Sequence, residues 1–397
     1  MNPELIDIIR LSSPHMSGNE MKYVIDAMER NQVFPLGQNV TDFEEALRTY
    51  TGTTACSCLS SGTAAIHLAL IILGVQPGDE VLCSTFTFAA SANPIVYLQA
   101  IPVFIDSEPS TWNMDPNLLR QAIHDRIRKT GKKPKLILLV HLYGMPADIE
   151  GIIAVSNEFN IPILEDAAEA LGSIYDGNHC GTYGEMGVYS FNGNKIITTS
   201  GGGALVSANK SLCNQATFLA TQARDEAPHY QHSQIGYNYR LSNISAGIGL
   251  GQMQILDERI AKRRENNTFY REAFQNIEGL TFLTEPSPKY YSNYWLTTIL
   301  INPKKIGITH QELYHHLKHH QIEARPLWKP MHLQPIFQPY PSYTTGVSES
   351  LFNQGLCLPS GSILTDAQRQ YVAESILNTL TQTKSTETRV LSAQRTE

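Results

Sequence analysis

Lys195 and Asp166 are the residues whose types and spacing most directly suggest chemistry. Lys195 ends the run SFNGNK at 190–195, and Asp166 lies 29 positions earlier (195 − 166), at the end of a mostly apolar stretch. A lysine in a partly desolvated pocket can form an imine with an aldehyde, and an anionic carboxylate can keep the ring nitrogen of an electron-withdrawing cofactor protonated. Each residue alone is ambiguous, because lysine is usually a solvated surface residue and an aspartate after a strand is commonly a helix cap.

A third segment, upstream of both residues, has the features of a phosphate site. The apolar stretch 55–59 runs into the small residues of 60–63, and an Ala- and Leu-rich segment follows. Free N–H groups and the positive end of the helix dipole at such a helix start can accept a phosphate. As a lone motif this segment is more simply an ordinary Ser/Thr cap. Together with Lys195 and Asp166, it predicts a pyridoxal phosphate site.

The chain resembles the fold-type-I pyridoxal phosphate aminotransferases of the DegT/StrS group, which act on nucleotide-linked keto sugars. The resemblance extends from Ser17 to about Leu377. Within the group the chain is most similar to the transaminases that make UDP-4-amino-4,6-dideoxy-N-acetylglucosamine for bacillosamine-type sugars. The stretches that carry the resemblance are 35–37, 85–88, 141–144, 165–172, 189–203, 236–243 and 325–332.

The resemblance assigns roles around the cofactor ring. It implies that Lys195 binds the cofactor covalently and then moves the proton between the substrate carbon and the cofactor. Asp166 would pair with the ring nitrogen, Phe88 would stack on one ring face and Ala168 would lie against the other. For Phe88 alone, a buried core position is the more ordinary interpretation.

The resemblance also assigns the phosphate contacts. Gly62 and Thr63 would supply N–H groups, Ser190 a hydroxyl, and Asn238 an amide from the neighbouring subunit. If a second chain completes the site, the minimal active unit is a homodimer.

Three further residues have less specific signals. Glu169 would lie near the phenolic oxygen of the cofactor with a raised pKa, or would be a carboxylate favoured by a helix N-terminus; both interpretations stay open. Arg325 and His332 resemble residues near the sugar pocket, although an Arg-Pro or Pro-Met-His segment is also typical of a rigid loop.

The resemblance implies a reaction. The amino group of L-glutamate would move to the C4 ketone of a UDP-linked 4-keto-6-deoxy-N-acetylhexosamine, giving a UDP-4-amino-4,6-dideoxy sugar and 2-oxoglutarate. The alternatives are an aminotransferase for a dTDP- or GDP-linked keto sugar, a sugar dehydratase with the same cofactor, and a non-catalytic sensor or scaffold. Lys195 argues against the dehydratases, which have histidine there. The C4 configuration of the product stays open.

The elements that must position these residues alternate along the first half of the chain. Apolar segments at 80–84, 102–106, 136–140 and 161–165 predict strands, and segments at 62–73, 116–129 and 148–159 predict helices. Such alternation predicts a mostly parallel sheet covered on both faces, with the ligand beyond the carboxyl ends of its strands. Two capping boxes, at 17–20 and 41–44, predict helices before the first strand.

The second half of the chain predicts a smaller domain. A helical pattern from 244 to 271 contains the expected junction, so we predict a large cofactor-binding domain with an N-terminal helical arm over 1–245 and a small α+β domain over 246–383. The polar segment 384–397 has little to bury and predicts a disordered tail.

Composition excludes several classes of protein. The 397 residues have a net charge of −7, which argues against a nucleic-acid binder. The start of the chain has no secretory signal, and no apolar run approaches 18 residues, so we expect a cytoplasmic enzyme.

The six cysteines are scattered, which disfavours a metal site. Histidines at 315, 316, 319 and 320 have metal-binding spacing but more simply form a solvated helix face. Glycines 201–203 indicate a close backbone approach rather than a dinucleotide motif.

Overall fold

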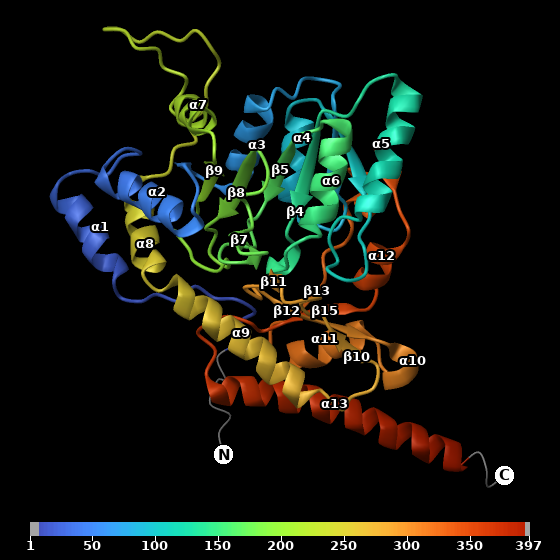
Figure 1. The fold of residues 1–397 in the computed structure, drawn as a ribbon. Helices are drawn as coiled ribbons and strands as arrows, with labels where there is room; N and C mark the ends of the chain where they lie inside the picture. Colours follow the sequence, from blue (N-terminus) through green and yellow to red (C-terminus); the bar gives the residue numbers. More distant parts are fainter. Residues whose placement is uncertain (1–7, 394–397) are drawn as a thin grey trace.

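An eight-stranded sheet forms the centre of the protein (Figure 1) in a computed structural model that describes residues 8–393. β9 runs antiparallel to both of its neighbours, and the strands from β8 to β14 are parallel. The mostly parallel sheet predicted from the alternation is therefore confirmed. In order across the sheet the strands are β1 (Ala55–Leu59), β9 (Gly203–Ser207), β8 (Met186–Ser190), β5 (Ile163–Asp166), β4 (Leu136–Val140), β2 (Glu80–Ser84), β3 (Ile101–Ile105) and β14 (Ser342–Tyr343).

Helices cover both faces of this sheet, which explains why its strands are continuously apolar. Side chains of α3 (Gly62–Ile72), α4 (Ala89–Tyr97) and α7 (Lys210–Ala220) share one core cluster with the sheet. Those of α5 (Pro116–Thr130) and α6 (Ile149–Phe159) share another. Every residue of β4 is buried, as a central strand requires.

A bundle of three helices flanks the β1 edge of the sheet. It consists of α1 (Glu20–Glu29), α2 (Gln38–Thr51) and α8 (Asn243–Met253), and α8 packs against both others. The glycines of α8 permit this close packing: a Cβ at Gly251 would lie 2.6 Å from the Glu20 nitrogen, and one at Gly249 2.6 Å from the Phe43 ring.

Two helix boundaries predicted from sequence were wrong. α2 begins at Gln38 with Gly37 as its N-cap, so Thr41 lies inside the helix and does not cap it. The pattern from 244 to 271 is not one helix, because the chain breaks at Gln254 and Ile255 before α9 (Leu256–Ala273). α9 then leads from the bundle to the second sheet (Figure 1).

The second sheet is antiparallel and smaller. Its order is β10 (Leu280–Phe282), β12 (Thr297–Ile301), β15 (Gly355–Leu358) and β13 (Arg325–Pro326). Side chains of α9, α11 (His310–His319) and α13 (Asp366–Ala393) pack on it in a third core cluster. The N-terminal residue Ile9 bridges to Ile322, so the start of the chain also lies against this part of the protein.

Short elements connect the two sheets. A three-stranded ribbon joins β11 (Tyr290–Tyr291) to β6 (Ile174–Tyr175) and β7 (Asn178–His179). The remaining elements are α10 (Pro303–Ile306), α12 (Val347–Phe352), η1 (Leu142–Gly144) and η2 (Met331–Leu333).

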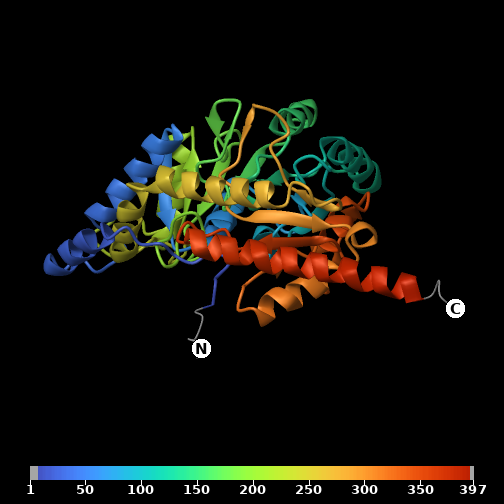
Figure 2. The same cartoon turned by 90° about the horizontal axis from the view of Figure 1, so that it is seen from below.

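The long last helix has a backbone that extends past the second sheet (Figure 2). α13 continues to Ala393, through most of the segment 384–397 for which the sequence predicts disorder. Residues 394–397 lie outside the described residues.

Within residues 8–393, no helix is both long and apolar enough to cross a membrane. The same residues contain no group of three metal-ligating side chains, and the α11 histidines form none. Instead, the His316 and His320 rings stack with their centroids 4.1 Å apart, and His320 Nδ1 lies 2.9 Å from the His316 carbonyl oxygen.

Candidate active site

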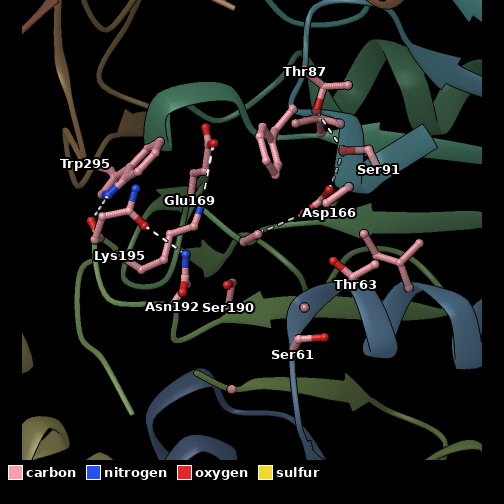
Figure 3. A pocket seen from close by; sticks show the side chains of 18 of the residues that line it. Ser61, Thr63, Thr87, Ser91, Asp166, Glu169, Ser190, Asn192, Lys195 and Trp295 are labelled. Atoms are coloured by element: carbon pink, nitrogen blue, oxygen red, sulfur yellow. Dashed lines mark hydrogen bonds and ion pairs between the residues drawn. The ribbon is translucent and has the colours of Figure 1, made fainter. Parts of the chain in front are cut away.

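A cavity of about 210 Å³ lies at the carboxyl ends of the parallel strands (Figure 3). Eight residues predicted from the sequence line it: Gly62, Thr63, Phe88, Asp166, Ala168, Glu169, Ser190 and Lys195. The structure thus brings together three segments that are far apart in the chain. The cavity also has lining residues that the sequence did not single out, among them Thr87, Ser91, Asn192, Asn194, Trp295 and Trp328.

The start of α3 forms one wall. The Ser61 Oγ accepts a hydrogen bond from the Ala64 nitrogen (3.0 Å), so the cap interpretation of this serine is correct. The first N–H groups of a helix have no intrahelical acceptor, which leaves those of Gly62 and Thr63 available to an anion. Ser190, at the end of β8, packs against Gly62, where an added Cβ would lie 3.2 Å from the Ser190 Cβ.

β9 approaches this helix start closely. A Cβ on Gly203 would lie 2.5 Å from the Gly62 nitrogen, which is too near for any side chain. The close backbone approach predicted for the three glycines is therefore confirmed at Gly203. It brings the β9 backbone directly against the proposed phosphate cradle.

Asp166 ends β5 and is held by donors from the same part of the fold. Its Oδ2 accepts a hydrogen bond from Ser91 Oγ (2.6 Å), and its Oδ1 accepts one from the Ala168 nitrogen (3.1 Å). The Thr87 Oγ1 lies 2.7 Å from Ser91 Oγ, which extends the network by one hydroxyl. Residues 167–172 are turns, so Asp166 is not a helix cap. Both partner hydroxyls come from the loop after β2 and the start of α4.

Lys195 faces a carboxylate and an aromatic ring. Its Nζ lies 3.5 Å from the Glu169 Oε1 and 4.1 Å from the centre of the Trp295 ring. The Trp295 Nε1 donates to the Asn194 carbonyl (2.7 Å), so the indole also contacts the main chain beside the lysine. No sequence signal pointed to Trp295, which lies 100 positions (295 − 195) after Lys195.

Glu169 is buried beside Lys195 rather than at a helix start. Its Oε2 accepts a hydrogen bond from the Tyr143 nitrogen (2.7 Å), and Tyr143 itself has a left-handed backbone conformation (φ 53°). Burial raises the pKa of Glu169, and the positive charge of Lys195 only partly opposes this effect. The helix-terminus interpretation is thus wrong, and the carboxyl group lies inside the cavity beside the lysine amine.

Phe88 lies at the mouth of the cavity and not in the core. It is 53% exposed, and its ring centroid lies 5.2 Å from that of Trp328. Ala168 lies deeper, in the turn between Asp166 and Glu169. The two residues expected to sandwich a ring therefore both reach the cavity.

Three predicted residues do not line the cavity of this chain. Asn238 is exposed and forms an isolated bridge with Thr221. Arg325 is exposed and pairs with Glu323 (2.9 Å).

His332, the third of these residues, is largely buried. Its Nδ1 lies 2.7 Å from Thr85 Oγ1, and its Nε2 lies 3.1 Å from the Glu349 carboxylate. This histidine is therefore engaged by neighbours of its own chain.

The residues present fit pyridoxal phosphate. Free N–H groups and a closely packed glycine form an anion cradle at one wall, and a carboxylate held by a hydroxyl and an N–H group faces the cavity from β5. A largely buried lysine amine lies in the same cavity. These three groups match the phosphate, the ring nitrogen and the aldehyde of this cofactor.

Comparison with known proteins shows one family over nearly the whole chain. Residues 14–377 match the DegT/DnrJ/EryC1/StrS aminotransferase family. The chain is 48% identical over 374 residues to a putative pyridoxal phosphate-dependent aminotransferase, EpsN, of Bacillus subtilis (strain 168), with 93% of this chain and 95% of the relative covered. It is 36% identical over 369 residues to the GDP-perosamine synthase of Escherichia coli O157:H7, covering 93% and 97% of the two chains. A DegT DnrJ EryC1 StrS aminotransferase from Brucella abortus superposes with a TM-score of 0.84 at 28% identity, covering 91% of this chain and 95% of that one.

Proposed function

The chain belongs to the DegT/DnrJ/EryC1/StrS aminotransferase family, and we propose that it aminates the C4 ketone of a UDP-linked 4-keto-6-deoxy-N-acetylhexosamine with L-glutamate as donor. Its class is that of a pyridoxal phosphate-dependent sugar aminotransferase of fold type I. The observation that carries the proposal is the meeting of Lys195, Glu169 and Asp166 in one cavity with the α3 cradle. The UDP-linked acceptor is supported by the sequence stretches that resemble bacillosamine-type transaminases.

The residues that line the cavity have separate roles in the proposed reaction. When bound, pyridoxal phosphate supplies an electron-withdrawing ring that stabilises negative charge at the carbon losing its proton. Lys195 Nζ takes that proton and returns it during the exchange of the amino group. Asp166, oriented by Ser91, keeps a negative charge beside the ring nitrogen. Glu169 and Trp295 flank the amine of Lys195 and limit the positions that it can adopt.

A GDP-linked 4-keto sugar is the second candidate acceptor. It is favoured by the relative described above as a GDP-perosamine synthase, which matches almost the full length of this chain. UDP and GDP sugars differ in the base, and selective recognition of a base requires polar groups placed to pair with it.

A panel of nucleotide-linked 4-keto sugars tests the acceptor. The purified enzyme is incubated with L-glutamate and each UDP-, dTDP- or GDP-linked sugar, and the amino sugar and 2-oxoglutarate are quantified. We expect the highest kcat/KM with the UDP-linked N-acetyl sugar. A GDP-linked sugar with the highest value would replace the proposed acceptor, and analysis of the product would assign its C4 configuration.

We propose further that the active unit is a homodimer. The segment after α7 leaves the body as an extended arm (Figure 1). Asn238 is exposed and bridges to Thr221, directly after α7, and it does not line the cavity of its own chain. An apolar N-terminal surface with no cover in the single chain supports the proposal, because large exposed apolar surfaces mark association sites. This surface consists of the exposed residues Met21, Ile25, Met28, Val33, Phe34 and Leu36.

Mixed dimers test whether the cavities are shared. If Asn238 serves the partner's site, a dimer of one Lys195→Ala chain and one Asn238→Asp chain has one intact site and one site with both lesions. If Asn238 serves its own chain, the same dimer has two damaged sites. We expect turnover to return on mixing the two inactive homodimers, as measured per isolated heterodimer. No recovery would remove Asn238 from the partner's site.

The bacillosamine-type pathway and the cytoplasmic location stay predictions from the sequence.

A further inference from the structure

Arg263, in the middle of α9, is an almost fully buried cation whose partners are uncharged. Only 1% of the residue is exposed. Its guanidinium donates to the carbonyl oxygens of Trp295 (2.6 Å) and Lys195 (3.4 Å) and to the Ser12 hydroxyl (2.9 Å). A further carbonyl, that of Ser360, lies 3.5 Å away. In the described part of the chain none of these hydrogen-bond partners is a carboxylate.

Such an arrangement costs free energy. Burial, together with the nearby charge of Arg259, lowers the pKa of Arg263 to about 9, so the guanidinium still carries its charge at neutral pH. A buried charge without a counterion is unfavourable, and well-packed apolar residues often replace buried charges without loss of stability. The position of this arginine therefore calls for a role other than stability.

The hydrogen bonds of Arg263 converge on the main chain that carries Lys195. Ser12, which accepts from the guanidinium, donates its own hydroxyl to the Asn194 carbonyl (2.6 Å). Trp295 donates its indole N–H to the same carbonyl, and its ring lies under the Lys195 amine. Asn194 and Lys195 are thus contacted by the start of the chain, by α9 and by the region before β12. We call Ser12, Arg263 and Trp295 the lysine clamp.

We propose that Arg263 is a positioning residue that, through the lysine clamp, fixes the main chain at Asn194 and Lys195 and thereby places Lys195 Nζ for bonding to the cofactor and for proton transfer. The inference rests on the proposed role of Lys195. Three donors on two consecutive carbonyls hold the peptide in place, and the Trp295 ring and the Glu169 carboxylate flank the Lys195 amine. Small displacements of a reacting group have large effects on rate.

Arg259 offers a matched control one turn earlier in α9. It too is buried, and its guanidinium donates to the carbonyls of His15 (3.2 Å) and Met16 (3.4 Å). It contacts the N-terminal segment but not the residues around Lys195. Its replacement removes a buried arginine and its positive charge from the same helix, but none of the hydrogen bonds of the lysine clamp.

The test compares Arg263→Met with Arg259→Met in three measurements. The first is the rate at which the cofactor becomes covalently attached to Lys195 after addition to the apoprotein, trapped with borohydride and located by peptide mass spectrometry. The second is amide hydrogen exchange over 192–198 in the apoprotein. The third separates kcat from KM in amino-group transfer.

We expect Arg263→Met to slow attachment and kcat by about tenfold to a hundredfold, to speed exchange over 192–198 and to leave the KM for the sugar little changed. Arg259→Met should keep attachment, kcat and exchange over 192–198 within about twofold of wild type. Equal values for the two variants would overturn the proposal.

Ser12→Ala is a second test of the lysine clamp, used if Arg263→Met fails to fold, because Ser12 links Arg263 to the Asn194 carbonyl. It should change attachment and exchange in the same direction but less, and an unchanged exchange rate over 192–198 would refute the clamp. In a double-mutant cycle with Arg263→Lys, coupled effects are expected, whereas additive ones would contradict a single unit. Attachment and exchange are measured without sugar, so a wild-type enzyme that aminated no UDP sugar would refute the proposed acceptor and not the clamp.

Discussion

The two ends of the cavity are built in different ways. At the end formed by Asp166 and the α3 cradle, the contacts come from the large sheet, the loops at its strand ends and the first turns of α3 and α4. At the Lys195 end, the contacts come from the N-terminal segment, from α9 and from the residues just before β12. The contacts of the first end exist once the large sheet and the helices that follow its strands have formed. The contacts of the second end also require the N-terminal segment, α9 and the residues before β12 to be in place.

The Asp166 end therefore acts through fixed charges, whereas the Lys195 end acts through the position of the lysine amine. The Asp166 end presents a carboxylate held by two hydrogen bonds and the free N–H groups at the start of α3. The Lys195 end presents a movable amine whose position depends on distant segments. Variants at the first end should therefore change the chemistry while leaving the rest of the fold unaffected, and variants at the second should also report on how those segments pack.

The largest effect is expected from Lys195→Ala. The variant loses both the covalent link and the proton carrier, so kcat should fall on the order of 10³-fold or more while the circular dichroism spectrum and cooperative melting are retained. Steady-state kinetics measure the fall in kcat, and thermal melting shows whether the fold is retained. Lys262→Ala, an exposed lysine on α9, is the control. Wild-type-like turnover by Lys195→Ala would remove Lys195 from the mechanism.

Asp166→Asn should lower kcat about a hundredfold, as expected when a preorganised electrostatic partner is removed. Ser91→Ala removes the 2.6 Å hydrogen bond to this carboxylate, together with the bond between Ser91 and Thr87, and should lower kcat about tenfold. Neither change should alter melting by more than a few degrees. An effect of Ser91→Ala as large as that of Asp166→Asn would show that the charge needs the hydroxyl to act.

Gly203→Ala tests the cradle without touching a polar group. The added Cβ would lie 2.5 Å from the Gly62 nitrogen, so β9 or the start of α3 must shift and the N–H groups must move. The Kd for pyridoxal phosphate should rise about tenfold or more. Gly201→Ala is a matched control, since its added Cβ meets nothing within 4 Å. Equal cofactor titrations for the two variants would show that the cradle tolerates displacement.

Glu169→Gln should have the smallest effect of these substitutions, a pH-dependent change in the stability of the apoprotein. Burial raises the pKa of Glu169 above its usual 4.5, so the folded apoprotein binds the proton more tightly than the unfolded chain. The ionised carboxylate therefore costs stability, and this cost is absent below the unfolded pKa and grows as pH rises through the folded one.

The stability of Glu169→Gln relative to wild type should thus improve as pH rises from about 4 to 8. Urea unfolding midpoints of the two apoproteins at several pH values measure the difference. A pH-independent difference would mean that Glu169 has the same pKa in both states, and Glu29→Gln, at the exposed end of α1, controls for a general effect of pH.

The sequence predicted the sheet end of the site because its signals are local. β1 and β4 are short segments followed by the polar residues Ser60 and His141, and β5 ends at Asp166. The carboxyl ends of parallel strands must meet at one edge. The pairing of Asp166 with Ser91, 75 positions away (166 − 91), was not predicted. Serine and threonine hydroxyls in a strand-to-helix loop have no sequence signal that distinguishes them from ordinary helix caps.

By itself, the sequence determined the strand and helix alternation, the small-residue turn into α3 and the residue types of the cofactor site. Only the tertiary structure decided where Lys195 points, that Glu169 is buried, and that Arg263, Ser12 and Trp295 surround the lysine. The physical reason is range. Backbone periodicity and caps act over a few residues, whereas burial and the choice among many polar partners depend on which distant segments meet after folding.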